Sequence, residues 1–169
     1  MKNPNKLSWS SPRFLSLGVL LAFTVSCGRP GENPRDVQAA TDAIRQQIAK
    51  YTAALDAADP TLAAEVWLTS PEVSFISPAG HQHGWEEVKK VYDFFGTTFS
   101  ERHLAARDIS VHVLGDAAWA EFYWHFAAKQ RSDGAPVQTD GRETQVYRKM
   151  DGTHWRLVHV HYSGPPAAP

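Results

Sequence analysis

The sequence predicts an α+β domain in which three helices precede a curved antiparallel β-sheet. Up to about residue 95, apolar residues recur at steps of three and four, which is the period of amphipathic helices. After residue 100 the period changes to two, and short turn signals separate the runs. Helices followed by long antiparallel strands pack on one face of the sheet. Because long strands coil, we expect a cone-shaped sheet with the helices on its concave face and a cavity at its wide end.

Each predicted helix has a start signal. Asn33 and Pro34 suit the cap and first position of a helix that ends near Ala57. Asp59 and Pro60 repeat the signal for a short helix through Trp67. A third helix begins at Trp85, and Gly96 either closes or bends it. The first helix carries one apolar stripe, formed by Val37, Ala40, Ile44, Ile48, Tyr51 and Leu55.

The strands are predicted from alternation and from the turns between them. Asp151-Gly152 is a hairpin signal, because both residues readily adopt positive φ. In the last strand, alternation alone leaves two inward-facing sets open: Trp155, Leu157, His159 and His161, or Arg156, Val158, Val160 and Tyr162. The expected strands are 73–77, 103–114, 117–129, 137–149 and 154–162, with a turn-rich segment or small hairpin at 78–84.

The N-terminus reads as a secretory leader. Residues 1–26 hold a basic segment and an apolar segment that is too short to span a membrane comfortably. Leu21–Cys27 resembles a bacterial lipobox, in which the cysteine is lipidated and becomes the first mature residue; the alternative is an ordinary cleaved signal with an incidental cysteine. We therefore predict lipidation at Cys27, a tether over 27–34, the domain over 35–163 and a disordered tail over 164–169.

Composition narrows the function. Of the 17 basic residues three lie in the leader, which leaves 14 against 18 acidic residues and argues against nucleic-acid binding. No nucleotide-binding glycine motif and no serine or cysteine nucleophile motif is found, and no cofactor is predicted. The His81/His83 and His159/His161 pairs could bind a metal. We predict no metal site, because no cysteine or spaced carboxylate joins them.

The C-terminal half carries a family resemblance. Val111–Gly115, Glu143-Thr144, Asp151-Gly152, Trp155 and Val158–Gly164 resemble the nuclear transport factor 2-like superfamily, which includes SnoaL-like cyclases and ketosteroid isomerases. The likeness is strongest to the association domain of calcium/calmodulin-dependent protein kinase II. That resemblance implies a homo-oligomer, either a dimer or a larger ring, and a pocket inside the cone.

The same resemblance implies which residues line the pocket. The family's histidine falls on His103, and its three arginine positions fall on Trp124, Gln145 and Tyr162, so an anionic ligand is not expected. Glu143 either holds a neighbouring arginine or is exposed. Trp85 either covers the cavity or simply packs. The predicted pocket comprises Tyr51, Trp85, His103, Trp124, Gln145, Tyr147 and Tyr162.

The sequence favours ligand binding over catalysis. Tyr51 falls on the oxyanion tyrosine of ketosteroid isomerases, but their two carboxyl positions fall on Ser77 and Gln145, and the chemistry needs those carboxyls. The leading hypothesis is a secreted, lipid-anchored envelope protein that self-associates and binds a small apolar or weakly polar molecule. The alternatives are a SnoaL-like isomerase, cyclase or hydratase using His103 or Tyr51, and a purely structural oligomerisation module.

Overall fold

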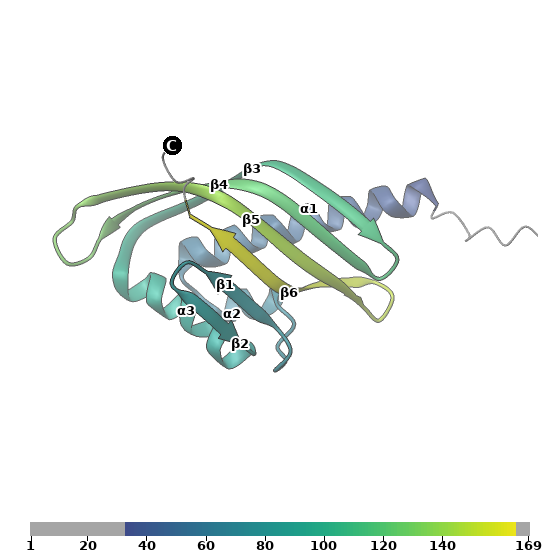
Figure 1. The fold of residues 1–169 in the computed structure, drawn as a ribbon, viewed down its shortest axis with the longest axis horizontal. Helices are drawn as coiled ribbons and strands as arrows, with labels where there is room; N and C mark the ends of the chain where they lie inside the picture. The colour runs from purple at the N-terminus through teal and green to yellow at the C-terminus, as the bar shows by residue number, and fades with distance from the viewer. Residues whose placement is uncertain (1–32, 165–169) are drawn as a thin grey trace, which may run out of the picture. The chain divides into compact units, whose positions relative to one another are not determined.

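The computed structural model describes residues 33–164 and confirms the predicted fold class: three helices pack on the concave side of one curved six-stranded sheet (Figure 1). Cys27, the leader and most of the predicted tether and tail lie outside the described residues. The helices are α1 (Pro34–Ala57), α2 (Pro60–Val66) and α3 (Trp85–Thr98). The strands are β1 (Ser74–Ser77), β2 (Gly80–His83), β3 (Phe99–Leu114), β4 (Ala117–Gln130), β5 (Pro136–Met150) and β6 (His154–Ser163).

The helix starts follow the capping signals in the sequence. Asn33 Oδ1 accepts a hydrogen bond from the Arg35 amide (3.1 Å), and Asp59 Oδ1 accepts one from the Thr61 amide (2.7 Å). The third helix continues through Gly96 to Thr98 rather than ending there. A Cβ at Gly96 would lie 3.2 Å from the Ala58 Cβ, so the glycine lets α3 approach the end of α1.

The sheet has the order β2-β1-β6-β5-β4-β3. The four long strands form the predicted antiparallel meander, and the Asp151-Gly152 turn has φ values of 50° and 69°. The segment before α3 forms the small hairpin β1–β2, and β1 pairs in parallel with β6. This hairpin brings the end of β6 close to the helical layer. Figure 1 shows the long strands arching over α1, with α3 beneath the β1–β2 hairpin.

Three bulges break the strict alternation of the long strands. Strand β3 has one extra residue between Ser100 and His103 and another between Arg107 and Ser110; Glu101 (φ 50°) and Asp108 (φ 56°) have left-handed backbones there. Strand β6 has one at Val158, since Val146 pairs with His159 whereas Tyr147 pairs with Leu157. Each bulge bends its strand and turns the following side chains to the other face.

Because of the β6 bulge, the inward-facing side chains of β6 come partly from each of the two sets expected from alternation. Trp155 and Leu157 are buried before the bulge, and Val160 is buried after it. His159 and His161 lie on the outer face, where they pair with Ser74 and Ile76 of β1. Strict alternation assumes that one set of alternate residues faces inward along the whole strand, and one added residue is enough to exchange the two faces partway along it.

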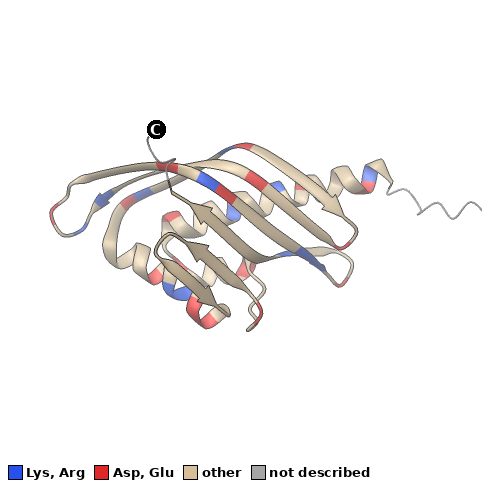
Figure 2. Cartoon of the chain, viewed as in Figure 1, with Lys and Arg blue, Asp and Glu red and all other residues tan. Residues whose placement is uncertain are grey.

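The core lies between α1 and the concave face of the sheet. Ile44, Ile48 and Tyr51 of α1 belong to the same buried cluster as the inward-facing residues of β4 and β5. No helix within residues 33–164 is both long and apolar enough to span a membrane. On the face seen in Figure 2, basic and acidic positions are interspersed over helices and strands.

Candidate functional site

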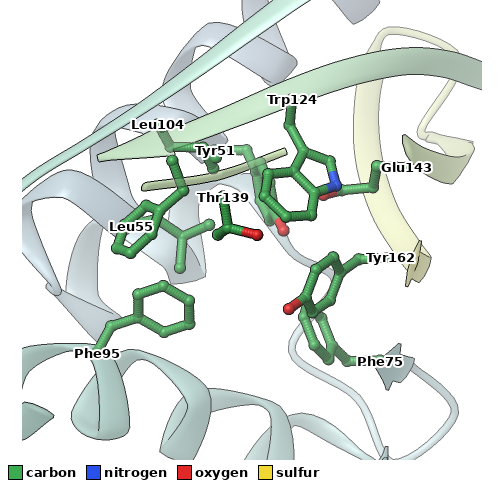
Figure 3. A pocket seen from close by; sticks show the side chains of 10 residues that line it. Tyr51, Leu55, Phe75, Phe95, Leu104, Trp124, Thr139, Glu143 and Tyr162 are labelled. Atoms are coloured by element: carbon green, nitrogen blue, oxygen red, sulfur yellow. The ribbon is translucent and has the colours of Figure 1, made fainter. Parts of the chain in front are cut away.

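The concave face holds a small apolar pocket, here called the inner pocket, with a cavity volume of about 50 Å³. Its walls come from α1, α3 and strands β1 and β3–β6, so every layer of the domain contributes. In Figure 3 the hydroxyl groups of Thr139 and Tyr162 turn into the space between the rings. The lining residues are Tyr51, Leu55, Phe75, Phe95, Leu104, Trp124, Phe126, Thr139, Glu143 and Tyr162.

Among residues 33–164, Glu143 is the one carboxyl group that lines the inner pocket, and it is 5% exposed. Gln145 Nε2 donates a hydrogen bond to Glu143 Oε1 (2.6 Å). The Tyr147 hydroxyl donates to Gln145 Oε1, which turns the amide nitrogen of Gln145 toward the carboxyl group. The Tyr51 hydroxyl donates to Glu143 from α1. Three neighbours on two elements therefore hold this carboxyl in place.

The environment of Glu143 favours its protonated form. Burial raises the pKa of Glu143 to about 7, and the hydrogen bonds from Gln145 and Tyr51 limit that rise. Burial and the nearby Glu143 charge also raise the pKa of Tyr51 well above its usual value, so its hydroxyl remains a donor. No arginine of the described part of the chain pairs with Glu143: Arg142 and Arg148 are exposed, and Arg156 donates to the Glu65 carbonyl. The pocket thus holds a carboxyl that titrates near neutral pH.

A larger cavity of about 440 Å³, here called the vestibule, adjoins the inner pocket and shares five lining residues with it. Glu87 and Lys90 of α3 are the charged residues among its walls. A cavity of this size is typical of small-molecule sites. The vestibule is lined by Phe75, Ser77, Ala79, Gln82, Glu87, Lys90, Val91, Phe94, Phe95, Phe99, Phe126, Val137, Thr139 and Tyr162.

The structure divides the residues that the sequence assigned to a pocket into three groups. Tyr51, Trp124 and Tyr162 line the inner pocket. Gln145 and Tyr147 are fully buried behind Glu143. Trp85 and His103 lie outside both cavities; Trp85 packs against the core at the start of α3.

His103 faces solvent because of the first β3 bulge. After the extra residue, Leu104 faces the pocket and the His103 side chain is 70% exposed. Its Nδ1 lies 3.3 Å from Asp56 Oδ2, while Asp56 Oδ1 accepts the Leu104 amide (2.6 Å). The histidine therefore stands at the surface junction of α1 and β3, away from Glu143.

The paired histidines gather on the outer face of β2, β1 and β6. His83 and His159 flank Ser74, and His81 and His161 flank Ile76. Ser74 Oγ lies 2.7 Å from His159 Nδ1, and the rings of His81 and His83 are 3.7 Å apart. Within the described part of the chain, no three histidine, cysteine or acidic side chains are placed to hold a metal ion.

Sequence reasoning did not place Glu143 in the pocket, although a signal was present. Glu143 is two residues before Gln145 and four before Tyr147, both of which were expected inside. Side chains two apart in a strand share a face. The same alternation therefore predicts that the Glu143 carboxyl faces inward, without a basic residue at the neighbouring inward positions of the strand.

Comparison with known proteins shows the family. The SnoaL-like domain family matches residues 44–168. A nuclear transport factor 2-like protein from Salmonella enterica serovar Typhimurium is 43% identical with a TM-score of 0.76, over 79% of this chain and 96% of that one. A protein with a cystatin-like fold from Caulobacter vibrioides is 23% identical with a TM-score of 0.63, over 75% and 90% of the two chains. A protein from Novosphingobium aromaticivorans, named for scytalone dehydratase, is 16% identical with a TM-score of 0.70, over 78% and 87%.

The fold and the concave-face pocket thus define a domain of the nuclear transport factor 2-like superfamily. Within it, the chain belongs to the SnoaL-like domain family. The closer likeness to the kinase II association domain stays a prediction.

The buried carboxyl makes stability depend on pH in a direction that follows from its pKa. In the folded chain the pKa of Glu143 is about 7, against 4.5 for an ordinary glutamate, so the folded state binds more protons between these values. Its contribution is full below pH 4.5 and is lost as pH rises through 7. We expect the free energy of unfolding to fall by up to about 3 kcal/mol relative to Glu143→Gln between pH 5 and pH 8.

Urea unfolding of the two proteins at several pH values measures this difference. Other titrating groups, including His159 with its lowered pKa, are common to both proteins and cancel in the comparison. Parallel stability curves from pH 5 to pH 8 would contradict the assignment.

Proposed function

We propose that this domain is an enzyme that transfers a proton to or from a small, largely apolar molecule, with Glu143 as the acid–base group. One observation carries the proposal: a buried carboxyl with a pKa of about 7 lines an apolar pocket. A group with a pKa near the working pH is effective in general acid–base catalysis. Perturbed carboxyls in clefts are also frequent at functional sites. The dehydratase name of one structural relative is compatible with this class of reaction.

The neighbours of Glu143 have distinct parts in this proposal. Gln145 and Tyr51 donate hydrogen bonds that stabilise the carboxylate, so they keep the pKa from rising further. Tyr147 positions Gln145 and does not line the pocket. When Glu143 acts as base, it removes a proton from carbon and becomes neutral, which suits its buried site. Acting as an acid, it returns that proton to another atom of the same molecule or to water.

Ligand binding without turnover is the second candidate. Of the residues that the structure describes, Glu143 is the one carboxyl lining the inner pocket, and no histidine is among the lining residues. Isomerases of this kind use a second carboxyl group, and that position falls on Gln145 here. A domain with the vestibule and one neutral carboxyl could simply hold its ligand.

Turnover of 5-nitrobenzisoxazole separates the two candidates. Its ring opens when one base removes the proton on carbon 3: the electron pair forms the nitrile, the nitrogen–oxygen bond breaks and a coloured phenolate leaves. We expect catalysis that rises with pH with a midpoint near 7, and a loss of about 10²- to 10⁴-fold in Glu143→Gln. We also expect Tyr51→Phe to move the midpoint to higher pH, because one stabilising hydrogen bond is removed.

Glu65→Gln on α2 is the matched control, since it removes a carboxylate away from both cavities. Equal rates for the native chain and Glu143→Gln, with the probe shown to bind, would rule out the enzyme and leave the binding function.

We also propose that the chain is an envelope lipoprotein anchored through Cys27. The leader, the lipobox-like Leu21–Cys27 and the following glycine- and proline-containing segment support this. A lipid on the first mature residue would hold the domain at the outer surface of the inner membrane or in the outer membrane.

Labelling with radioactive palmitate in a bacterial host tests the anchor. We expect label and membrane fractionation for the native chain and loss of both for Cys27→Ser, with Ser26→Ala labelled normally. Unlabelled, soluble native protein would show instead an ordinary cleaved leader.

We further propose that two copies associate through the outer face of the sheet. The helices cover only the concave face, and the outer face exposes Trp119 (38%) and Tyr123 (44%) on β4 and Leu114 (68%) on β3. Exposed aromatic and large apolar residues on one sheet face are typical of interfaces. Trp119 is stacked on His112 of the neighbouring strand, with ring centroids 4.8 Å apart and the ring planes 14° apart, and this contact orients its indole ring.

Sedimentation of the chain lacking residues 1–27 measures this association. We expect a dimer or larger ring at micromolar concentration that Trp119→Lys dissociates, because a charge would be buried without a partner. Leu62→Lys on α2, at 40% exposure, is the control and should leave the oligomer intact. A native monomer at that concentration would refute the proposal.

A further inference from the structure

Four histidines that have no part in the inner pocket lie together on the outer face of the sheet. Two of them are on β2 and two are on β6, and β1 pairs with both strands. Figure 1 shows β6, β1 and β2 next to one another at one edge of the sheet. The fold thus joins two His-x-His segments that are far apart in the sequence. They are here called the outer histidine cluster: His81, His83, His159 and His161.

The register of the strands places all four side chains on one face. Phe75 of β1 lines the inner pocket, so its neighbours Ser74 and Ile76 face outward. Each of these two residues is paired with one histidine of β2 and one histidine of β6. Residues that pair directly across neighbouring strands lie on the same face. The four imidazoles therefore surround Ser74 and Ile76 on the outer surface.

The two imidazoles of β2 are in contact and have free nitrogen atoms. His81 and His83 are both exposed, and their ring centroids are 3.7 Å apart. Neither ring makes a hydrogen bond or ion pair to another described residue. Because the side chains are exposed, they can change rotamer without a movement of the backbone. Two such rings on one strand face can bind the same ion.

His159 is suited to be a third ligand. Its Nδ1 lies 2.7 Å from Ser74 Oγ. In the tautomer whose Nδ1 donates to that hydroxyl, Nε2 is an acceptor and can bind a metal, an arrangement typical of metal-binding histidines. Burial lowers the pKa of His159, and positive charge on His161 or His81 lowers it further. His81 and His159 are thus close enough to interact across β1.

The chemistry of this cluster favours a transition metal. Three neutral imidazoles are a sufficient ligand set for a divalent ion. Imidazole suits copper and zinc, whereas magnesium and calcium prefer oxygen ligands. Among residues 33–164 no three possible ligands converge on one point as they stand, so binding requires the exposed rings to rotate. Neither pair alone offers three ligands, which is why no metal site was predicted from the sequence.

We propose that the outer histidine cluster binds a divalent transition-metal ion, with His81 and His83 as the chelating pair and His159 as the third ligand. Water completes the coordination. Cu²⁺ binds more tightly than Ni²⁺ or Zn²⁺, as is general for nitrogen ligands. The site lies on the face of the sheet opposite the inner pocket, so it does not depend on the proton transfer proposed for Glu143.

Calorimetric titration with Cu²⁺ tests the site. The full chain is used with Cys27→Ser, because a thiolate would itself bind copper. We expect a single bound Cu²⁺, weaker binding of Ni²⁺ and Zn²⁺, and no binding of Mg²⁺. His81→Gln and His83→Gln should each weaken Cu²⁺ binding by roughly 100-fold and His159→Gln by at least tenfold, since loss of a residue that only supports a ligand costs about 10- to 100-fold.

His154→Gln is the matched control, because it removes an exposed imidazole from the other end of β6. It should leave Cu²⁺ binding unchanged. In the native chain, small amounts of paramagnetic Cu²⁺ should broaden the imidazole signals of His81, His83 and His159 before those of the other histidines. Absence of Cu²⁺ binding, equal affinity in the native chain and the His81→Gln/His83→Gln double variant, or an equal loss in His154→Gln would overturn the site. Unchanged affinity in His159→Gln would overturn the third ligand.

Discussion

The curvature of the long strands is the constraint on which the rest of this domain depends. Strands β3, β4 and β5 have 16, 14 and 15 residues, and a sheet of that length must coil to cover α1. The bulges at Glu101, Asp108 and Val158 provide local bends. A flat sheet would press its inner side chains directly onto the helix. The curved sheet leaves the inner pocket and vestibule between itself and α3, so the site is a consequence of strand length.

The same bends explain which parts of the structure could be predicted. The helix starts at Asn33 and Asp59 and the turn at Asp151-Gly152 rest on local chemistry, and the structure shows them as expected. The faces of β3 and β6 depend on single extra residues that no local signal marks. Alternation therefore gave two incompatible sets for β6, and the structure uses part of each. His103 faces outward for the same reason.

The site itself could be predicted where strands lack bulges. Strand β4 is regular between its turns, and Trp124 lies on the inner face as expected. Strand β5 is equally regular through Gln145, so Glu143 shares the inner face with it. Arg142 and Arg148 of the same strand are exposed, so neither compensates the charge of the Glu143 carboxyl.

The Glu143 carboxyl is the unusual feature of the inner pocket. A buried carboxylate is unfavourable unless charges or donors compensate it, and here only Gln145 and Tyr51 do so. The chain thus retains a group that destabilises it when ionised, within a wall otherwise made of rings. Because the pKa of Glu143 is about 7, this carboxyl changes its protonation state near neutral pH, and its ionised form lowers the stability of the folded chain.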